Sequence, residues 1–151
     1  MNALLQARDL RVTFNLRREG DMPWTPKREL QAVRGVNFSL AEGETLGIVG
    51  ESGSGKSTLA RALIALAPAS GEVVFRGQNL LALSPAQMLA YRSQIQMVFQ
   101  DPLASLNPRM TVGQIIAEPL VTHHAGLSSA EVKARVQVAM DRVGLLPNQI
   151  N

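Results

Sequence analysis

The fold is decided by one stretch of the sequence, Gly50-Glu51-Ser52-Gly53-Ser54-Gly55-Lys56-Ser57-Thr58. It fills every position of the pattern G-x-x-x-x-G-K-[ST], which is typical of loops that bind phosphate groups. Glycine has no Cβ, so Gly53 and Gly55 can take left-handed backbone conformations that turn successive N–H groups toward an anion. A helix that begins at Lys56 would aim its unbonded amides at the same anion. The stretch therefore predicts a phosphate-binding loop at the start of a helix.

Two side chains of this loop have chemistry suited to a magnesium polyphosphate. Lys56 carries a mobile positive charge that can reach the outer phosphates. The hydroxyl of Ser57 can fill one coordination position of Mg²⁺, which keeps several waters and needs only one or two protein oxygens. We therefore expect Lys56 to act on the phosphates and Ser57 on the metal.

The segments on either side of the loop supply the order strand, loop, helix. Residues 45–49 form a short apolar run expected to be a buried strand. After the loop, a helix is expected to run until Pro68 ends it. Its apolar residues recur on one helical face at Leu59, Leu63, Ile64 and Leu66. A Gly/Ser-rich turn that matches by chance is the alternative, and the full pattern with its flanks favours the phosphate loop.

Length and composition are those of a single domain with its own core. The chain has 151 residues, of which 46% are apolar and 18% charged, and no apolar run approaches the about 20 residues that cross a bilayer. Without cysteine, neither a disulfide nor a thiolate metal site is possible. The net charge of +3 comes from residues 1–40, which carry seven Lys/Arg against four Asp/Glu. Interleaved signs favour a solvated loop there, with nucleic acid, lipid headgroups or a triphosphate as alternative partners.

Alternating apolar residues predict strands outside the loop. We expect them over residues 4–14, 36–40, 70–77 and 95–99, with an exposed excursion over 15–29. Because the early strands follow one another without helices between them, they favour an antiparallel sheet. Trp24, the only tryptophan, lies in the excursion. Its ring is expected to pin the excursion to the surface, and a ligand contact is the alternative.

Helix-capping residues predict three further helices. One begins at Ser84-Pro85, one is capped by Thr111, runs through Ala117 and stops at Pro119, and one begins at the capping box Ser128-Ser129-Ala130-Glu131 and ends at Gly144.

Four features follow one another along the chain: Phe14, the loop 50–58, the segment 70–77 and Val98-Phe99-Gln100-Asp101-Pro102. In this order they resemble the nucleotide-binding subunit of an ABC transporter. The string Phe99-Gln100-Asp101-Pro102-Leu103-Ala104-Ser105-Leu106-Asn107-Pro108-Arg109-Met110-Thr111-Val112 resembles the oligopeptide/dipeptide importer branch, as does Val49-Gly50-Glu51-Ser52-Gly53. The resemblance covers nearly the whole chain. It implies the α/β fold of a P-loop NTPase, an ABC-type nucleotide-binding domain with an antiparallel β subdomain, the start of a helical subdomain and an incomplete core sheet.

The resemblance also implies a division of the chain. Residues 1–151 would be the N-terminal part of one nucleotide-binding domain. In that division, residues 1–49 supply strands before the loop, residues 50–100 run from the Walker A loop to the Q-loop, and residues 101–151 hold the Q-loop and the start of the helical subdomain.

Site roles follow from the same resemblance. Lys56 and Gln100 would be catalytic, and Ser57 and Gln100 would bind Mg²⁺. Phe14 matches the aromatic residue that stacks on adenine, although its alternation with the apolar residues before it fits a core residue equally well, and Trp24 is its rival. The residues that would bind ATP are Gly50, Ser52, Gly53, Ser54, Gly55, Lys56, Ser57, Thr58 and Phe14.

Hydrolysis needs further groups that we do not find in these residues. In phosphate-loop enzymes a second, acidic anchor for Mg²⁺ follows an apolar strand. No carboxylate after the loop follows four apolar residues: the candidates are Glu72, Asp101, Glu118, Glu131 and Asp141. The family's signature motif, Walker B Asp, catalytic Glu and switch His lie downstream of a segment like residues 145–147. We therefore expect the N-terminal half of an ATPase, one that hydrolyses ATP poorly or not at all.

The predicted function is an ATP-binding, energy-coupling subunit of an ABC importer for peptides or related small solutes. Its expected partners are transmembrane permease subunits, a second nucleotide-binding subunit and, indirectly, a periplasmic or extracellular solute-binding protein. The expected place is peripheral, on the cytoplasmic face of the inner (cell) membrane. One alternative is a non-transport ABC ATPase that acts on nucleic acid, supported only by the basic N-terminus, so no nucleic-acid partner is expected. The other is a small-molecule P-loop kinase, whose clustered arginines are not seen after Lys56.

Overall fold

Two compact units make up the chain, Met1–Leu89 and Ala90–Asn151, and each is described by itself. The computed structural model describes residues 3–16, 20, 22, 24, 28–101, 105–124, 126–146, 148 and 150. Among these residues no helix is long and apolar enough to cross a membrane.

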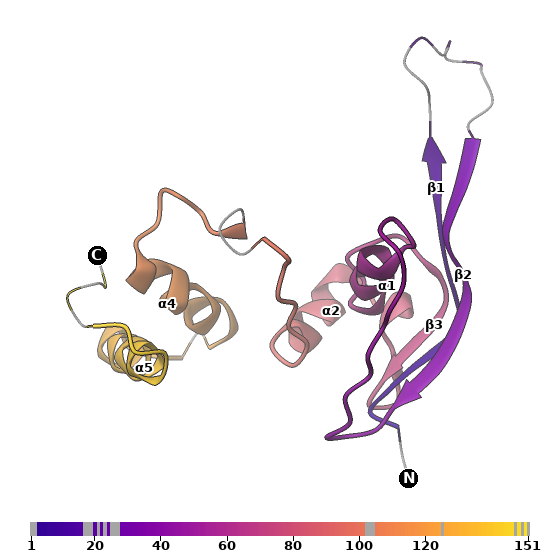
Figure 1. The fold of residues 1–151 in the computed structure, drawn as a ribbon. Helices are drawn as coiled ribbons and strands as arrows, with labels where there is room; N and C mark the ends of the chain where they lie inside the picture. Colours follow the sequence, from indigo (N-terminus) through magenta and orange to yellow (C-terminus); the bar gives the residue numbers. More distant parts are fainter. Residues whose placement is uncertain are drawn as a thin grey trace. The chain divides into compact units, whose positions relative to one another are not determined.

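The first unit is built on an antiparallel sheet of order β2-β1-β3-β4 (Figure 1). Its strands are β1 (Leu5–Leu16), β2 (Arg28–Leu40), β3 (Ser70–Phe75) and β4 (Gln78–Asn79). The expected antiparallel sheet is therefore confirmed. The sequence prediction missed residues 28–35 of β2 and the two-residue strand β4, which is too short to show alternation.

One face of this sheet packs against helix α1 (Lys56–Leu63), which contacts β1 and β2. In β1, β2, β3 and α1, the buried residues are the apolar ones that alternate along the strands, together with two residues of α1. They are Ala7, Leu10 and Val12 of β1, Val33 of β2, Val73 and Phe75 of β3, and Leu59 and Ala62 of α1. Burial of this alternating set is the main stabilising contribution to the sheet.

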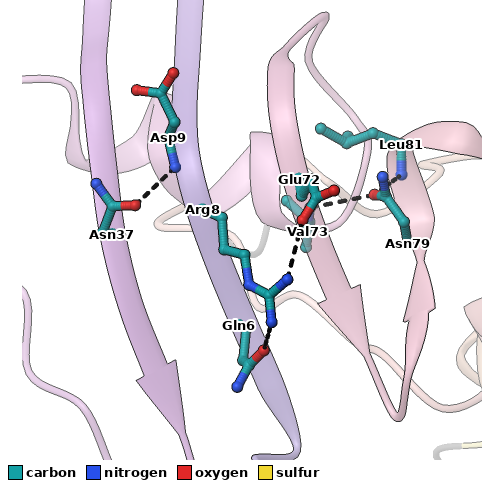
Figure 2. Close-up of polar contacts among 8 residues, drawn as sticks. All are labelled: Gln6, Arg8, Asp9, Asn37, Glu72, Val73, Asn79 and Leu81. Atoms are coloured by element: carbon teal, nitrogen blue, oxygen red, sulfur yellow. Dashed lines mark hydrogen bonds and ion pairs between the residues drawn. The ribbon is translucent and has the colours of Figure 1, made fainter.

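Asp9 marks an irregularity where three strands meet. It has a φ of +43° and forms an extra residue in β1, because Ala7 pairs with Phe38 and Leu10 with Val36. The Asp9 amide donates a 2.8 Å hydrogen bond to the side chain of Asn37 (Figure 2). Side-chain bonds thus satisfy a backbone group that the regular ladder leaves out.

Side chains also connect β1 to β3 and close the end of the sheet. Arg8 donates to Glu72 at 3.3 Å and to Gln6 at 2.7 Å (Figure 2). The Asn79 side chain accepts from the amides of Val73 and Leu81, and so caps the short 3-10 helix η1 (Leu80–Ala82).

The strands β1 and β2 continue past the end of β3 as a two-stranded ribbon (Figure 1). Strand β3 pairs only as far as Arg11, whereas β1 and β2 pair up to Leu16 and Arg28. The expected excursion over 15–29 is therefore wrong at both ends, because cross-strand pairing extends into it. Trp24 is 78% exposed, so the expectation that its ring pins the excursion is also wrong. Within the described residues, the ribbon offers this ring no packed surface.

Two predicted strands do not form. Residues 45–49 and 95–99 take no strand conformation, and Val49 and Val98 are 97% and 91% exposed. Apolar runs of this kind are stable as strands only when neighbours pair with both edges and cover both faces. Neither segment has such neighbours within its own unit among the described residues.

Helix α1 ends earlier than expected. It stops at Leu63, and Ala65 takes a left-handed φ of +52°, so Ile64 and Leu66 lie outside the helix. The amide of Leu66 donates to Arg61 and that of Ala65 to Ala62, which is a Schellman motif. This local turn, rather than Pro68, ends the helix.

Helix α2 (Pro85–Arg92) begins at the expected Ser84-Pro85, and the boundary between the two units falls within it. The Ser84 hydroxyl accepts from the Gln87 amide at 3.4 Å, and the Ser84 amide donates to the Gln87 side chain at 2.9 Å. The predicted start of this helix is confirmed.

The second unit contains helices α4 (Val112–His123) and α5 (Ser129–Arg142), which pack against each other. Both predicted caps form complete capping boxes, Thr111 with Gln114 and Ser128 with Glu131. The predicted stop at Pro119 is wrong, because α4 continues through it to His123. Proline removes a single hydrogen bond of the helix, and the bonds on either side of it are enough to continue the helix here.

Candidate phosphate-binding site

The backbone of residues 50–58 takes the conformation that its glycines predict. Gly53 and Gly55 have φ values of +79° and +96°, both in the left-handed region. Helix α1 begins at Lys56, directly after Gly55, and no side chain caps it. Its first turn also contains no acidic residue. The first amides of α1 and the positive end of its dipole therefore stay available to an anion.

The ammonium group of Lys56 is held over the loop by neutral oxygens. Its Nζ donates to the carbonyl oxygens of Gly50 at 2.8 Å and Glu51 at 2.6 Å, and to the Ser54 hydroxyl at 3.4 Å. Because these acceptors carry no charge, the ammonium keeps its net positive charge above the loop. These three acceptors use all the donors of the ammonium, so contact with the outer phosphates of a nucleotide would replace some of these bonds.

The remaining loop residues lie at the surface of the same structure. Ser52 and Ser57 are exposed, and Thr58 is half-buried in α1. A Cβ on Gly50 would lie 2.8 Å from the Ser54 hydroxyl, a side-chain atom that can rotate away. All the predicted loop residues therefore belong to one continuous turn at the start of α1.

A cavity of about 580 Å³ lies between the loop and strand β2. Its lining combines five loop residues with six residues of β2 and three apolar neighbours. They are Gly50, Gly53, Ser54, Gly55 and Lys56; Leu30, Gln31, Ala32, Val33, Arg34 and Val36; and Ile48, Val49 and Leu59. This volume is within the range of small-molecule sites.

Phe14 is not itself a lining residue of this cavity, but its ladder partner is. Phe14 is half-buried and pairs across the ribbon with Leu30, which lines the cavity. Residues directly opposite each other in a ladder project to the same face. Its rival Trp24 is largely exposed, and neither ring is among the lining residues of the cavity.

Gln100 is exposed and belongs to the second unit, whereas Ser57 belongs to the first. Their shared role at Mg²⁺ therefore stays a prediction. Among the described residues, no group of three or more His, Cys, Asp or Glu could hold a metal ion. A cation at this site would depend on the Ser57 hydroxyl and on phosphate oxygens of the ligand.

Two basic residues at the start of the chain, and one later in it, pair with carboxylates. Arg11 pairs with Asp9 at 2.8 Å, Arg8 pairs with Glu72 at 3.3 Å, and Arg76 lies 3.9 Å from Glu42. The hydrogen bonds from Arg11 hold the pKa of Asp9 below its ordinary value. At these positions the positive charge is offset locally, as is common on a solvated surface.

Strand β2 is the part of the site that the sequence interpretation missed. Residues 28–35 show no regular alternation, because two extra residues, Ala32 and Gly35, interrupt the pairing with β1. The pairs Arg11↔Arg34 and Thr13↔Gln31 lie on either side of Ala32 and Val33. A signal that allows for such bulges would have extended the strand back to Arg28.

Together, the sheet, the glycine loop and the helix that follows define an ATP-binding cassette fold of the ABC type. The structure is similar to the dimeric ATP-binding cassette MJ0796, solved in a post-hydrolysis state bound to ADP and Pi. The TM-score is 0.78 at 24% identity, over 97% of this chain and 60% of that chain. The ABC transporter family matches residues 33–150, and the chain belongs to this family.

The curated relatives support the same branch as the sequence motifs. The chain is 56% identical over 149 residues to the oligopeptide transport ATP-binding protein OppF of Escherichia coli K12, and 53% identical to OppF of Haemophilus influenzae. It is 48% identical over 145 residues to the glutathione import ATP-binding protein GsiA of Escherichia coli K12. These alignments cover 98%, 98% and 95% of this chain, but 45%, 45% and 23% of the relatives. The chain thus spans less than half the length of these relatives, and the resemblance to the oligopeptide importer branch is confirmed.

Proposed function

We propose that this chain supplies the ATP-binding loop of an energy-coupling subunit in an ABC importer for peptides or related small solutes. The single observation that carries the proposal is the loop itself, with two left-handed glycines, an uncapped helix start and the Lys56 ammonium above them. Membership in the ABC transporter family and the similarity to OppF support the transport role.

Each residue of the loop has a distinct task in this proposal. The amides from Gly53 to Thr58 surround the phosphates, and Lys56 neutralises the outer two. Ser57 binds Mg²⁺ directly, and Gln100 is the second candidate ligand. Phe14 stacks on adenine, for which its pairing with the cavity residue Leu30 is the support.

Hydrolysis and transport depend on partners in this proposal. A second nucleotide-binding subunit closes over ATP, and transmembrane permease subunits receive the resulting motion on the cytoplasmic side of the membrane. A solute-binding protein outside the membrane delivers the solute to the permease. Because no carboxylate after the loop follows an apolar strand, the chain by itself is expected to bind ATP with little turnover.

Calorimetric titration of the full chain with Mg-ATP tests the proposal. Lys56→Ala is expected to weaken binding by about 10- to 150-fold, because a hydrogen bond to a charged group contributes roughly 1.5–3 kcal/mol. Lys133→Ala is the matched control: it removes the same charge from α5 and should leave the affinity unchanged. Equal binding by wild type and Lys56→Ala would contradict the assignment, and Lys56-dependent turnover would contradict the expected lack of hydrolysis.

The two alternative functions have little support. The described arginines 8, 11 and 76 are paired with carboxylates, which weakens the case for nucleic acid. Membership in the ABC transporter family leaves the kinase alternative without support. Retention on DNA that falls steeply with salt would favour the first alternative.

A further inference from the structure

Ala32 is an extra residue in strand β2. Val12 pairs with Val33 and the next residue, Thr13, pairs with Gln31, so Ala32 has no partner in this ladder. An extra residue of this kind bends the strand and increases its twist. The bend lies at the point where β1 and β2 leave the rest of the sheet and continue as the ribbon.

The same residue touches the phosphate loop. A Cβ built on Gly55 would collide with the carbonyl oxygen of Ala32, so the two backbones are in direct contact. Ala32 also lines the cavity beside the loop, together with Gly50 and Lys56. One backbone position therefore both interrupts the ladder and lies against the loop.

Phe14 lies two residues beyond this bend. It pairs with Leu30 and projects to the face of Val12, which is buried. The angle of the ribbon at Ala32 thus decides where the Phe14 ring lies relative to Gly55 and the phosphates above it.

We infer that Ala32 is a positioning residue that sets the distance between the base platform on the ribbon and the phosphate loop. The inference rests on the proposed function, since it assumes that the loop binds a triphosphate. It predicts that the preference for ATP over inorganic tripolyphosphate depends on the bulge, whereas binding of tripolyphosphate alone does not.

Deletion of Ala32 tests this with little other change. The pairs Val12↔Val33, Thr13↔Gln31 and Phe14↔Leu30 all remain possible, and side chains on the shortened strand still alternate between faces. The deletion removes only the bend and its contact with Gly55. Two matched controls are Ala32→Gly, which keeps the bulge, and deletion of Gly20, which shortens the connection without touching the ladder.

The measurement is calorimetric affinity for Mg-ATP and for magnesium tripolyphosphate, each on the full chain. Stacking on an aromatic ring predicts that the wild type prefers ATP by about 5- to 150-fold. The Ala32 deletion should lower this ratio to about 1 while tripolyphosphate affinity changes by less than about 3-fold. Both controls should keep the wild-type ratio.

A second variant covers the case in which the deletion does not fold. Insertion of an alanine between Val12 and Thr13 gives Ala32 a partner, keeps its carbonyl, and moves Phe14 and Leu30 to the opposite face. The ATP preference should again be lost with tripolyphosphate binding retained. A ratio that survives in either folded variant overturns the inference, whereas a wild type that does not bind tripolyphosphate overturns the proposed function instead.

Discussion

Gly55 packs its Cα directly against the backbone carbonyl of Ala32, leaving no room for a side chain. Gly53, two residues earlier, has open space where its Cβ would be. Both glycines have left-handed φ values, so they share the conformational requirement and differ only in the contact. A comparison of the two glycines therefore separates the cost of a left-handed backbone from the cost of a steric collision within one loop.

This difference predicts a graded response to alanine. Gly53→Ala should lower the free energy of unfolding by about 1–2 kcal/mol, the cost of a left-handed alanine. Gly55→Ala should lower it by a further ~1–3 kcal/mol, because the new methyl group must displace the Ala32 backbone. Urea denaturation followed by circular dichroism measures both. An equal loss of unfolding free energy in the two variants would show that the contact with Ala32 adds no cost to the substitution at Gly55.

Ala65 offers a stabilising substitution. It holds the left-handed position of the Schellman motif after α1, with a φ of +52°, where glycine is the preferred residue. Ala65→Gly should raise the free energy of unfolding by about 0.5–1 kcal/mol. Ala60→Gly, inside α1, is the control and should lower it by a similar amount, since it places glycine in a helix interior. A loss in both variants would argue against the strain at Ala65.

Pro119 should weaken helix α4 at its centre. Proline lacks the amide that would donate to Ile115, and the helix continues without that bond. Pro119→Ala should stabilise α4 by about 1–3 kcal/mol. The readout is slower amide hydrogen exchange along residues 115–123. Pro85→Ala is the control, because Pro85 is the first residue of α2 and its missing amide has no helical acceptor, so exchange there should hardly change.

Local signals were the ones that the sequence interpretation read correctly. The capping boxes at Thr111 and Ser128 and the left-handed Gly53 and Gly55 each depend on a few adjacent residues, and the structure has them all. Residues 45–49 failed as a strand because a parallel strand is decided by distant neighbours, which no local pattern reveals.

In the candidate site, too, the features set by adjacent residues could be predicted and those set by distant neighbours could not. The loop residues follow from the spacing of Gly50, Gly55 and Lys56 alone. The opposite wall, from Leu30 to Val36, could not be predicted, because its bulges at Ala32 and Gly35 arise from pairing with β1. Whether Gln100 joins the site depends on contacts between separate units, which local spacing does not encode.

The capping bonds of Glu131 predict that the stability of helix α5 depends on pH. The Ser128 hydroxyl donates to its carboxylate at 2.7 Å and the Ser128 amide at 2.8 Å, and these bonds lower the pKa of Glu131. A lowered pKa in the folded state means that the stabilisation is present above the pKa of the unfolded chain. It is lost as the pH falls through the pKa of the folded chain.

Glu131→Gln tests this, because glutamine can still accept the capping bonds but does not titrate. The melting temperature of the variant should lie below that of the wild type near pH 7, and the difference should disappear at a pH below the pKa of Glu131 in the folded chain. Ser128→Ala, in which the capping hydroxyl is lost, should be destabilised at both pH values. A difference between Glu131→Gln and wild type that stays constant with pH would contradict the role of the charge.

The exposure of Val98 predicts that copies of the chain associate with one another. It is 91% exposed in the apolar run 95–99, which forms no strand among the described residues of its unit. Exposed apolar segments with open backbone groups pair with copies of themselves, and a charge on such a segment opposes this pairing. Val98→Lys should therefore reduce the concentration-dependent increase in mass seen by light scattering. Val138→Lys adds the same charge at a 52% exposed position on α5, where the helix already uses its backbone bonds, and should leave association unchanged. If both lysines reduced association equally, net charge rather than the open segment would be the cause.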